Sequence, residues 1–188
     1  MPATAVRVLT GPASFFRDMP KTGGYPEPFV FAVVMAAAGG AVQAVLGLAG
    51  LKMASGVEAG AASIIMMPVA VAIGGFLWAG ILYLVWKFMG SAEPYETAYR
   101  CSAYALGAIL PITAVFGVIP FAGVVLSVAL STYLLVTASS LVHGIPAVKA
   151  WIVFGVIGVL LILVGLSQEK VARDLVGSGA LVANGQGR

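Results

Sequence analysis

Apolar residues fall into five long stretches along this chain, separated by short segments that hold most of its charged residues. The longest uncharged run extends from Cys101 to Val142 and contains no Asp, Glu, Lys, Arg or His. Because one membrane crossing needs about 20 residues, this run is long enough for two. The turn residues in its middle are Gly117, Pro120 and Gly123, which predict a tight hairpin between two spans.

The pattern predicts an all-α fold, a polytopic integral membrane protein built as a bundle of five transmembrane helices. The expected spans are 29–51, 61–86, 102–119, 121–141 and 150–167. In the first span, Ala36, Gly40 and Ala44 form a ridge of small residues suited to close helix packing. Pro68 and Pro111 predict kinks in the second and third spans.

The segments on either side of the spans are more polar. Residues 1–28 contain five prolines, which exclude a long helix and favour a short cytoplasmic or interfacial segment, with a flexible tail as the alternative. Residues 29–167 form the expected membrane domain. Residues 168–188 are rich in glycine and polar residues, so we expect a disordered tail.

Composition supports a membrane protein. Hydrophobic residues make up 61% of the chain and charged residues 9%, against about 25% charged in soluble domains. The net charge of +3 is scattered, without the basic stripe that nucleic acid requires, so we expect no nucleic-acid partner. Cys101 is the only cysteine, which excludes an intramolecular disulfide.

The distribution of basic residues predicts the orientation, because cytoplasmic loops carry an excess of Lys and Arg. The side of the membrane that holds the N-terminus has six basic residues: Arg7, Arg17, Lys21, Lys87, Arg100 and Lys149. The other side has four: Lys52, Lys170, Arg173 and Arg188. We therefore expect a cytoplasmic N-terminus and, after five spans, a C-terminus on the outside.

One group of polar residues stands out on the expected cytoplasmic side. It comprises Glu93, Tyr95, Glu96, Tyr99, Arg100 and Tyr104 from one connection, and His143 and Lys149 from the next. We expect this group, together with the segment from Arg7 to Lys21, to form an edge that docks a cytoplasmic protein or a lipid headgroup. A structural alternative is that Glu96 and Arg100 pair across one helical turn while the tyrosines anchor the membrane interface. A zinc or manganese site at Glu93, Glu96 and His143 is a further alternative.

The sequence shows no catalytic motif or cofactor-binding motif, so we expect a protein without enzymatic activity and without a cofactor. An alternative function is a small-solute carrier or lipid-handling protein with a cavity between the proline-kinked helices. That cavity would be lined near Pro68 and Pro111 by Gln43, Ser127 and Ser131. The spans hold no charged residues for proton or ion relay, which argues against ion-coupled transport.

Three groups of motifs resemble bacterial members of the Yip1 family, in order, between Val8 and Leu166. The first is Val8-Leu9-Thr10, Pro12, Phe15-Phe16-Arg17-Asp18-Met19-Pro20, Gly23-Gly24-Tyr25 and Pro28-Phe29-Val30-Phe31. The second is Tyr95, Ala98-Tyr99-Arg100, Ala103-Tyr104 and Pro111. The third is Leu141, His143-Gly144-Ile145-Pro146 and Lys149-Ala150.

This resemblance implies a five-helix domain with a cytoplasmic N-terminus, here in the bacterial inner membrane. Eukaryotic relatives act in vesicle traffic, associate with Rab GTPases and form homo- and hetero-oligomers. Because this chain lacks their long N-terminal region, the Rab role is not transferred to it. The expected function is a non-enzymatic membrane scaffold or adaptor that contacts membrane lipids, self-associates, and binds another membrane or cytoplasmic protein.

Overall fold

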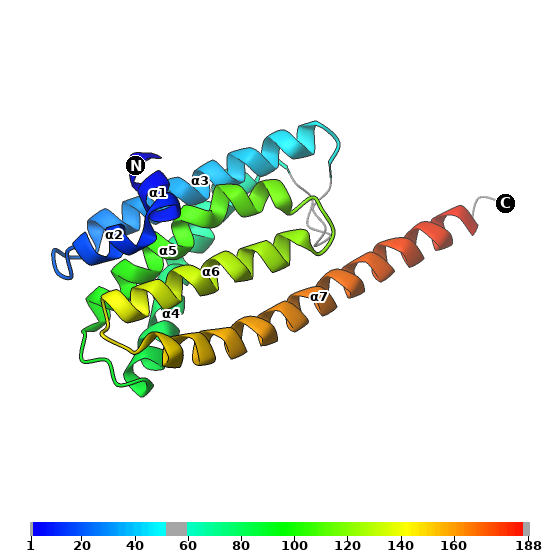
Figure 1. Cartoon of the computed structure of the whole chain (residues 1–188). Helices are drawn as coiled ribbons and strands as arrows, with labels where there is room; N and C mark the ends of the chain where they lie inside the picture. Colours follow the sequence, from blue (N-terminus) through cyan, green and yellow to red (C-terminus); the bar gives the residue numbers. More distant parts are fainter. Residues whose placement is uncertain (1, 52–59, 186–188) are drawn as a thin grey trace.

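The structure, a computed structural model, describes residues 2–51 and 60–185, with side chains as far as Leu175. All regular structure in these ranges is helical (Figure 1). The helices are α1 (Pro2–Thr10), α2 (Pro12–Asp18), α3 (Pro26–Leu48), α4 (Ser63–Phe88), α5 (Tyr95–Phe116), α6 (Ala122–Leu141) and α7 (Ala147–Gly185). Five of them, α3 to α7, are long and apolar enough to cross a membrane, which confirms the predicted fold class.

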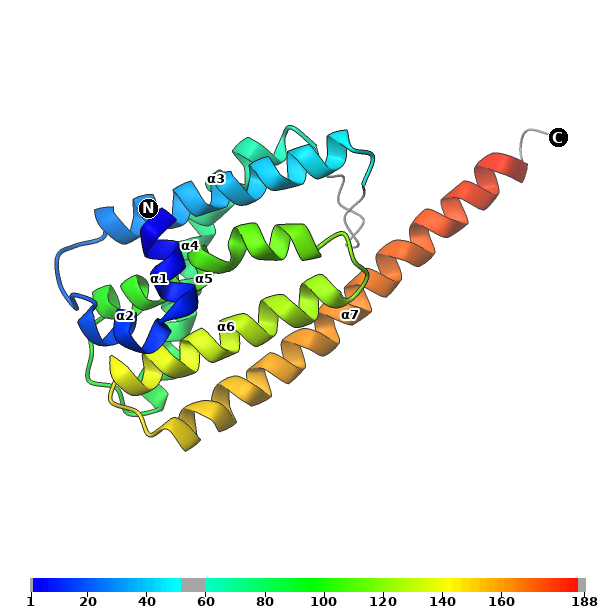
Figure 2. The same ribbon diagram turned by 45° about the horizontal axis from the view of Figure 1, so that its top comes forward.

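The N-terminal segment is ordered, so the flexible-tail alternative is wrong. Helices α1 and α2 begin at Pro2 and Pro12, where proline suits the first helical turn because no N–H is needed there. They pack against α5 and α6 (Figure 2). Val8 and Phe16 are buried in these contacts. Burial of these apolar faces fixes two helices that are too short to be stable alone.

Helix α5 is the centre of the bundle and packs against α1, α3, α4 and α6. Of its most apolar stretch 61% is buried, against 6% for α4, whose outer surface is left for lipid. The third span was predicted to begin at Ser102, whereas the helix begins seven residues earlier, at Tyr95. The first turns of α5 are polar, so the hydropathy pattern left them out of the predicted span. They are buried by the N-terminal segment and do not face lipid.

Glycines set the closest helix contacts. A Cβ at Gly40 of α3 would overlap the carbonyl group of Ser63, at the start of α4. A Cβ at Gly107 of α5 would lie 3.3 Å from the Cα of Ala32 on α3. Small residues let the helix backbones approach in this way, as the ridge at Gly40 predicted. Helices α4 and α5 continue through Pro68 and Pro111, so neither proline ends its helix.

Helix α7 extends past the rest of the bundle (Figure 1) and is helical to Gly185, which contradicts the predicted disorder from residue 168. Glu169 of α7 is buried and accepts a hydrogen bond of 2.8 Å from the backbone N–H of Phe121. The guanidinium of Arg173 lies 4.7 Å from the centre of the Phe121 ring. These contacts with the α5–α6 turn stabilise the helical conformation at the polar start of the tail.

Two charged positions used in the sequence analysis, Lys52 and Arg188, lie outside the described residues.

Candidate functional site

Three connections meet at one end of the bundle, which we call the polar end. They are residues 19–25 before α3, residues 89–94 between α4 and α5, and residues 142–146 between α6 and α7 (Figure 1). Because consecutive spans run in opposite directions, these connections must lie on the same side. The predicted polar group lies at or near this end.

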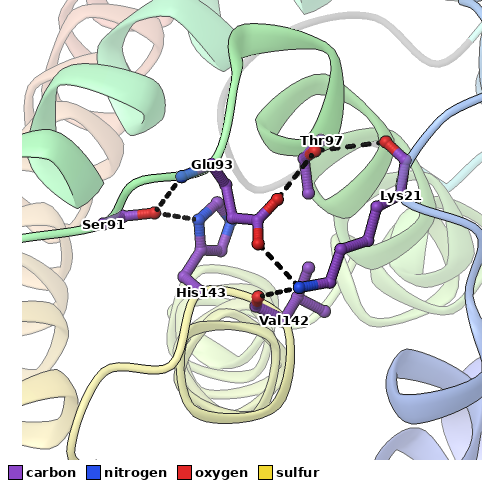
Figure 3. Close-up of polar contacts among 6 residues, drawn as sticks. All are labelled: Lys21, Ser91, Glu93, Thr97, Val142 and His143. Carbon is purple, nitrogen blue, oxygen red and sulfur yellow. Dashed lines mark hydrogen bonds and ion pairs between the residues drawn. The ribbon is translucent and has the colours of Figure 1, made fainter.

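Lys21 joins the three connections (Figure 3). Its Nζ donates to Glu93 Oε1 at 2.6 Å and to the carbonyl of Val142 at 3.0 Å. Thr97 Oγ1, in the first turn of α5, lies 3.1 Å from the carbonyl of Lys21 and 3.4 Å from Glu93 Oε2. A single ammonium group therefore links segments that are far apart in the sequence.

His143 belongs to the same network. Its Nδ1 lies 2.8 Å from the hydroxyl of Ser91, which also accepts a 3.2 Å hydrogen bond from the backbone N–H of Glu93. The imidazole stacks on Trp86 with 4.1 Å between the ring centres. Burial lowers the pKa of His143 to about 4, and the positive charge of Lys21 acts in the same direction while Glu93 opposes it. The imidazole is therefore neutral at neutral pH.

Arg100 holds the N-terminal segment against α5. Its side chain is 1% exposed. Its Nε donates to the carbonyl of Pro20 at 2.8 Å and its Nη1 to the carbonyl of Gly24 at 2.9 Å, while Nη2 lies 3.3 Å from Glu27 Oε2. Guanidinium groups suit such multiple contacts because their donors have a fixed, planar geometry.

Glu96 also binds this segment. Its Oε1 accepts a 2.7 Å hydrogen bond from the backbone N–H of Gly24. Gly23 and Gly24 have φ values of 124° and 80°, a region that glycine adopts readily and other residues rarely do. The structural alternative that paired Glu96 with Arg100 is therefore wrong, because each of the two side chains binds the N-terminal segment instead.

The predicted tyrosines lie mostly inside the protein. Tyr99 is buried and stacks on Phe76 with 4.4 Å between ring centres, and the Tyr95 hydroxyl donates to the carbonyl of Phe76 at 2.8 Å. Tyr104 is buried deeper along α5, where its ring lies 5.2 Å from that of Phe15. Their aromatic contacts join the N-terminal segment, α4 and α5.

Lys149 is the exposed member of the predicted group. Its Nζ donates to the carbonyl of Met89, just past the C-terminal end of α4, at 2.9 Å. A cation is favourable at that position because the last carbonyls of a helix carry partial negative charge.

The three residues of the metal alternative are not brought together. Glu96 accepts a hydrogen bond from the backbone of Gly24. Glu93 binds Lys21, and His143 binds Ser91. Within residues 2–51 and 60–185, no group of three or more His, Cys, Asp or Glu is placed to hold a metal ion.

Two cavities open between the membrane helices, away from the polar end. One, of about 260 Å³, lies between α3, α4 and α5; the other, of about 200 Å³, lies between α4, α5, α6 and α7. Ser127 and Ser131 line the second cavity, as the lipid-handling alternative expected. Gln43, Pro68 and Pro111 line neither of the two, so the prolines do not shape them directly.

Sequence reasoning missed Thr97 and Ser91, and it placed Lys21 in the N-terminal part of the docking edge without predicting its partners. One signal could have found Thr97: it shares an α-helical face with Arg100 and Tyr104, at spacings of three and seven residues. A helix that presents three such residues to one side has a polar neighbour there. Ser91 gives no comparable signal, because its role depends on the approach of His143 from another connection.

Comparison with known proteins identifies the family. The Yip1 domain matches residues 6–167, a range that includes α2 to α6 and most of α1 and of the membrane part of α7. No curated protein and no solved structure gave a match. The motifs around Arg17, Arg100 and His143, which suggested this relationship, contribute to the polar end. The chain is therefore a multi-pass membrane protein that belongs to the Yip1 family.

Proposed function

We propose that this Yip1-domain protein is a non-enzymatic membrane scaffold or adaptor that presents the polar end as a docking surface. The observation that carries the proposal is the network at that end. Lys21, Glu93 and Arg100 fix three connections and the N-terminal segment in one arrangement. A surface that is rigid before binding loses little conformational entropy when a partner docks.

The docking residues are the accessible ones at this end. Phe88, the last residue of α4, is 88% exposed, and Val148 of α7 is 72% exposed beside Lys149. Tyr95 and Glu96 are partly exposed, whereas Tyr99, Arg100, Tyr104 and His143 are buried. In this proposal the buried four hold the surface in shape and the exposed residues contact the partner, on the cytoplasmic side of a bacterial inner membrane.

Site-specific photocrosslinking in native membranes tests this proposal. A photoreactive amino acid at Phe88 or Val148 should yield protein adducts, while the same group at Ile73, an exposed residue well inside α4, should yield mainly lipid adducts. Mixing isotopically light and heavy copies of the chain separates self-association from binding of another protein. Adducts at Phe88 and Val148 that do not exceed those at Ile73 would contradict the scaffold proposal.

A second candidate function, the handling of a lipid or small solute, is favoured by the two cavities between the membrane helices. It differs from the scaffold in where the ligand lies, because the cavities are lined by membrane-helix residues and not by the connections of the polar end.

A further inference from the structure

The cavity between α4, α5, α6 and α7 is lined by apolar side chains together with several hydroxyl groups. Its lining includes Trp78, Leu106, Ser127, Thr132 and Gly158. Trp78 and Leu106 also line the cavity between α3, α4 and α5, so the two cavities share a wall. Neither cavity has a charged residue in its lining.

The hydroxyl groups of α6 fall into two sets. Ser131, Thr137 and Ser139 donate to the carbonyl four residues earlier, at 2.7, 2.8 and 2.6 Å. Ser127 and Thr132 line the cavity, and neither hydroxyl has a hydrogen-bond partner in the described part of the chain. Back-bonding is the usual arrangement for such residues in a membrane helix, so these two hydroxyls remain available to a ligand.

Trp78 is a third unused donor. Trp86, nearer the polar end, donates from its indole Nε1 to Ser139 Oγ at 2.7 Å. The indole N–H of Trp78 has no such acceptor among the residues that the structure describes. It lies ten residues before the end of α4, which corresponds to about 15 Å along a helix. Trp78 is 36% exposed in a helix apolar enough to cross a membrane. An unmatched polar group in hydrocarbon is unfavourable.

The backbone keeps this site open. A Cβ at Gly158 of α7 would lie 2.8 Å from Thr132 Oγ1, so a larger residue there would press on the hydroxyl. In the neighbouring cavity, Gly74 and Gly75 of α4 have open space where their Cβ atoms would be.

We propose that these adjoining cavities bind one neutral lipid that carries a carbonyl oxygen and reaches from one cavity into the other past Trp78 and Leu106. The carbonyl accepts hydrogen bonds from Trp78, Ser127 or Thr132, and the apolar body of the ligand occupies the space beside Gly74 and Gly75. The donors select an acceptor oxygen. The uncharged lining selects a neutral molecule, because an ion at this depth has no partner. This inference rests on the second candidate function and is independent of the scaffold proposal.

Binding to the full-length chain in phosphatidylcholine nanodiscs tests the proposal. The probes are decylubiquinone and dioctanoylglycerol, two neutral carbonyl lipids of different origin, and phosphatidylglycerol is the charged comparison. Binding is followed by tryptophan fluorescence and by the thermal unfolding midpoint. At least one neutral probe should bind in preference to phosphatidylglycerol, and the two arms identify which kind of lipid the site takes.

Variants decide whether the cavity is the site. The double change Ser127→Ala and Thr132→Val should weaken binding of that probe roughly tenfold, because two hydrogen bonds are lost. Thr137→Val, at a hydroxyl that already bonds to the Tyr133 carbonyl, should leave binding unchanged. Gly75→Leu should block the apolar cavity, whereas Gly80→Leu on the same helix, which has open space and lines neither cavity, should not.

Three results would overturn the proposal: no neutral probe binds above empty nanodiscs, phosphatidylglycerol binds as well as the neutral probes, or the double variant binds like Thr137→Val. As a control, Thr132→Ser alone retains the hydroxyl and should bind the probe like the wild type. This control separates the loss of a donor from a general packing defect. Failure of the scaffold proposal is read from the crosslinks at Phe88 and Val148, so the two outcomes are distinguishable.

Discussion

At the scale of single residues, buried polar side chains in this protein connect parts of the chain to one another. Arg100 and His143 looked like surface residues in the sequence because they lie beside polar connections. Both are buried, and their partners come from other segments. A charged group that is buried in this way is strongly destabilising when its partners are removed.

His143 should make stability depend on pH. Its pKa is about 4 in the folded protein and 6.5 when unperturbed, so the unfolded chain binds the extra proton between these values. Stability from this residue is therefore fully present above about pH 6.5 and is lost as the pH falls toward 4. We expect the free energy of unfolding to fall by about 2 kcal/mol between pH 7.5 and pH 5.

Thermal unfolding in nanodiscs at both pH values measures this effect, with His143→Asn as the comparison. The variant loses the titration, so its midpoint should change less with pH than that of the wild type. Equal pH dependence in the two proteins would show that another group is responsible.

Arg100 should be irreplaceable by lysine. Arg100→Lys retains the charge but cannot reach the carbonyls of Pro20 and Gly24 together, so we expect a loss of about 3 kcal/mol. Residues 19–25 should then be cleaved faster in limited proteolysis. Arg17→Lys, at an exposed position, is the matched control and should behave like the wild type.

At the scale of elements, the contacts between helices depend on where a glycine meets a backbone. Gly40 and Gly80 are both glycines within apolar helices, yet the first lies against the Ser63 carbonyl and the second has open space around it. Hydropathy cannot distinguish these two positions. They differ in whether the backbone of another helix crosses close to the glycine.

This difference gives a paired test. Gly40→Ala should force α3 and α4 apart, strain the hydrogen bond from Ser63 Oγ to the Gly40 carbonyl, and cost about 2 kcal/mol. Gly80→Ala should be neutral or stabilise α4 by up to about 1 kcal/mol, because alanine favours the helix. Thermal midpoints of the two variants measure both effects, and equal destabilisation would contradict the packing described for Gly40.

Sequence reasoning predicted the spans well because each depends on a local property, the length of an apolar run in lipid. It placed the start of the third span seven residues after the start of α5, since Glu96 and Arg100 are charged and the sequence does not show their partners. It missed the continuation of α7 for the same reason. Glu169 is accommodated in the helix because its carboxylate accepts a hydrogen bond from the backbone N–H of Phe121. Of the site, the sequence predicted that Glu93, Arg100 and His143 lie at or near the polar end, but it missed Ser91 and Thr97 and did not show which side chains are buried.

At the scale of the whole molecule, the distribution of basic residues predicts that the polar end faces the cytoplasm. Cysteine labelling checks this prediction. With the buried Cys101 changed to serine, Phe88→Cys should react with a membrane-impermeant maleimide only in inverted vesicles, and Gln168→Cys only in intact spheroplasts. The opposite pattern would reverse the orientation and move the proposed docking surface outside.

The link from Lys21 to Val142 spans 121 positions of the chain. Ribosomes deliver this protein from its N-terminus, so α1 and α2 exist well before the surface that covers them. Until the connection after α6 has been synthesised, Val8 and Phe16 lack their final neighbours. The first helices made are therefore among the last to dock, because α1 waits for α5 and α2 waits for α6.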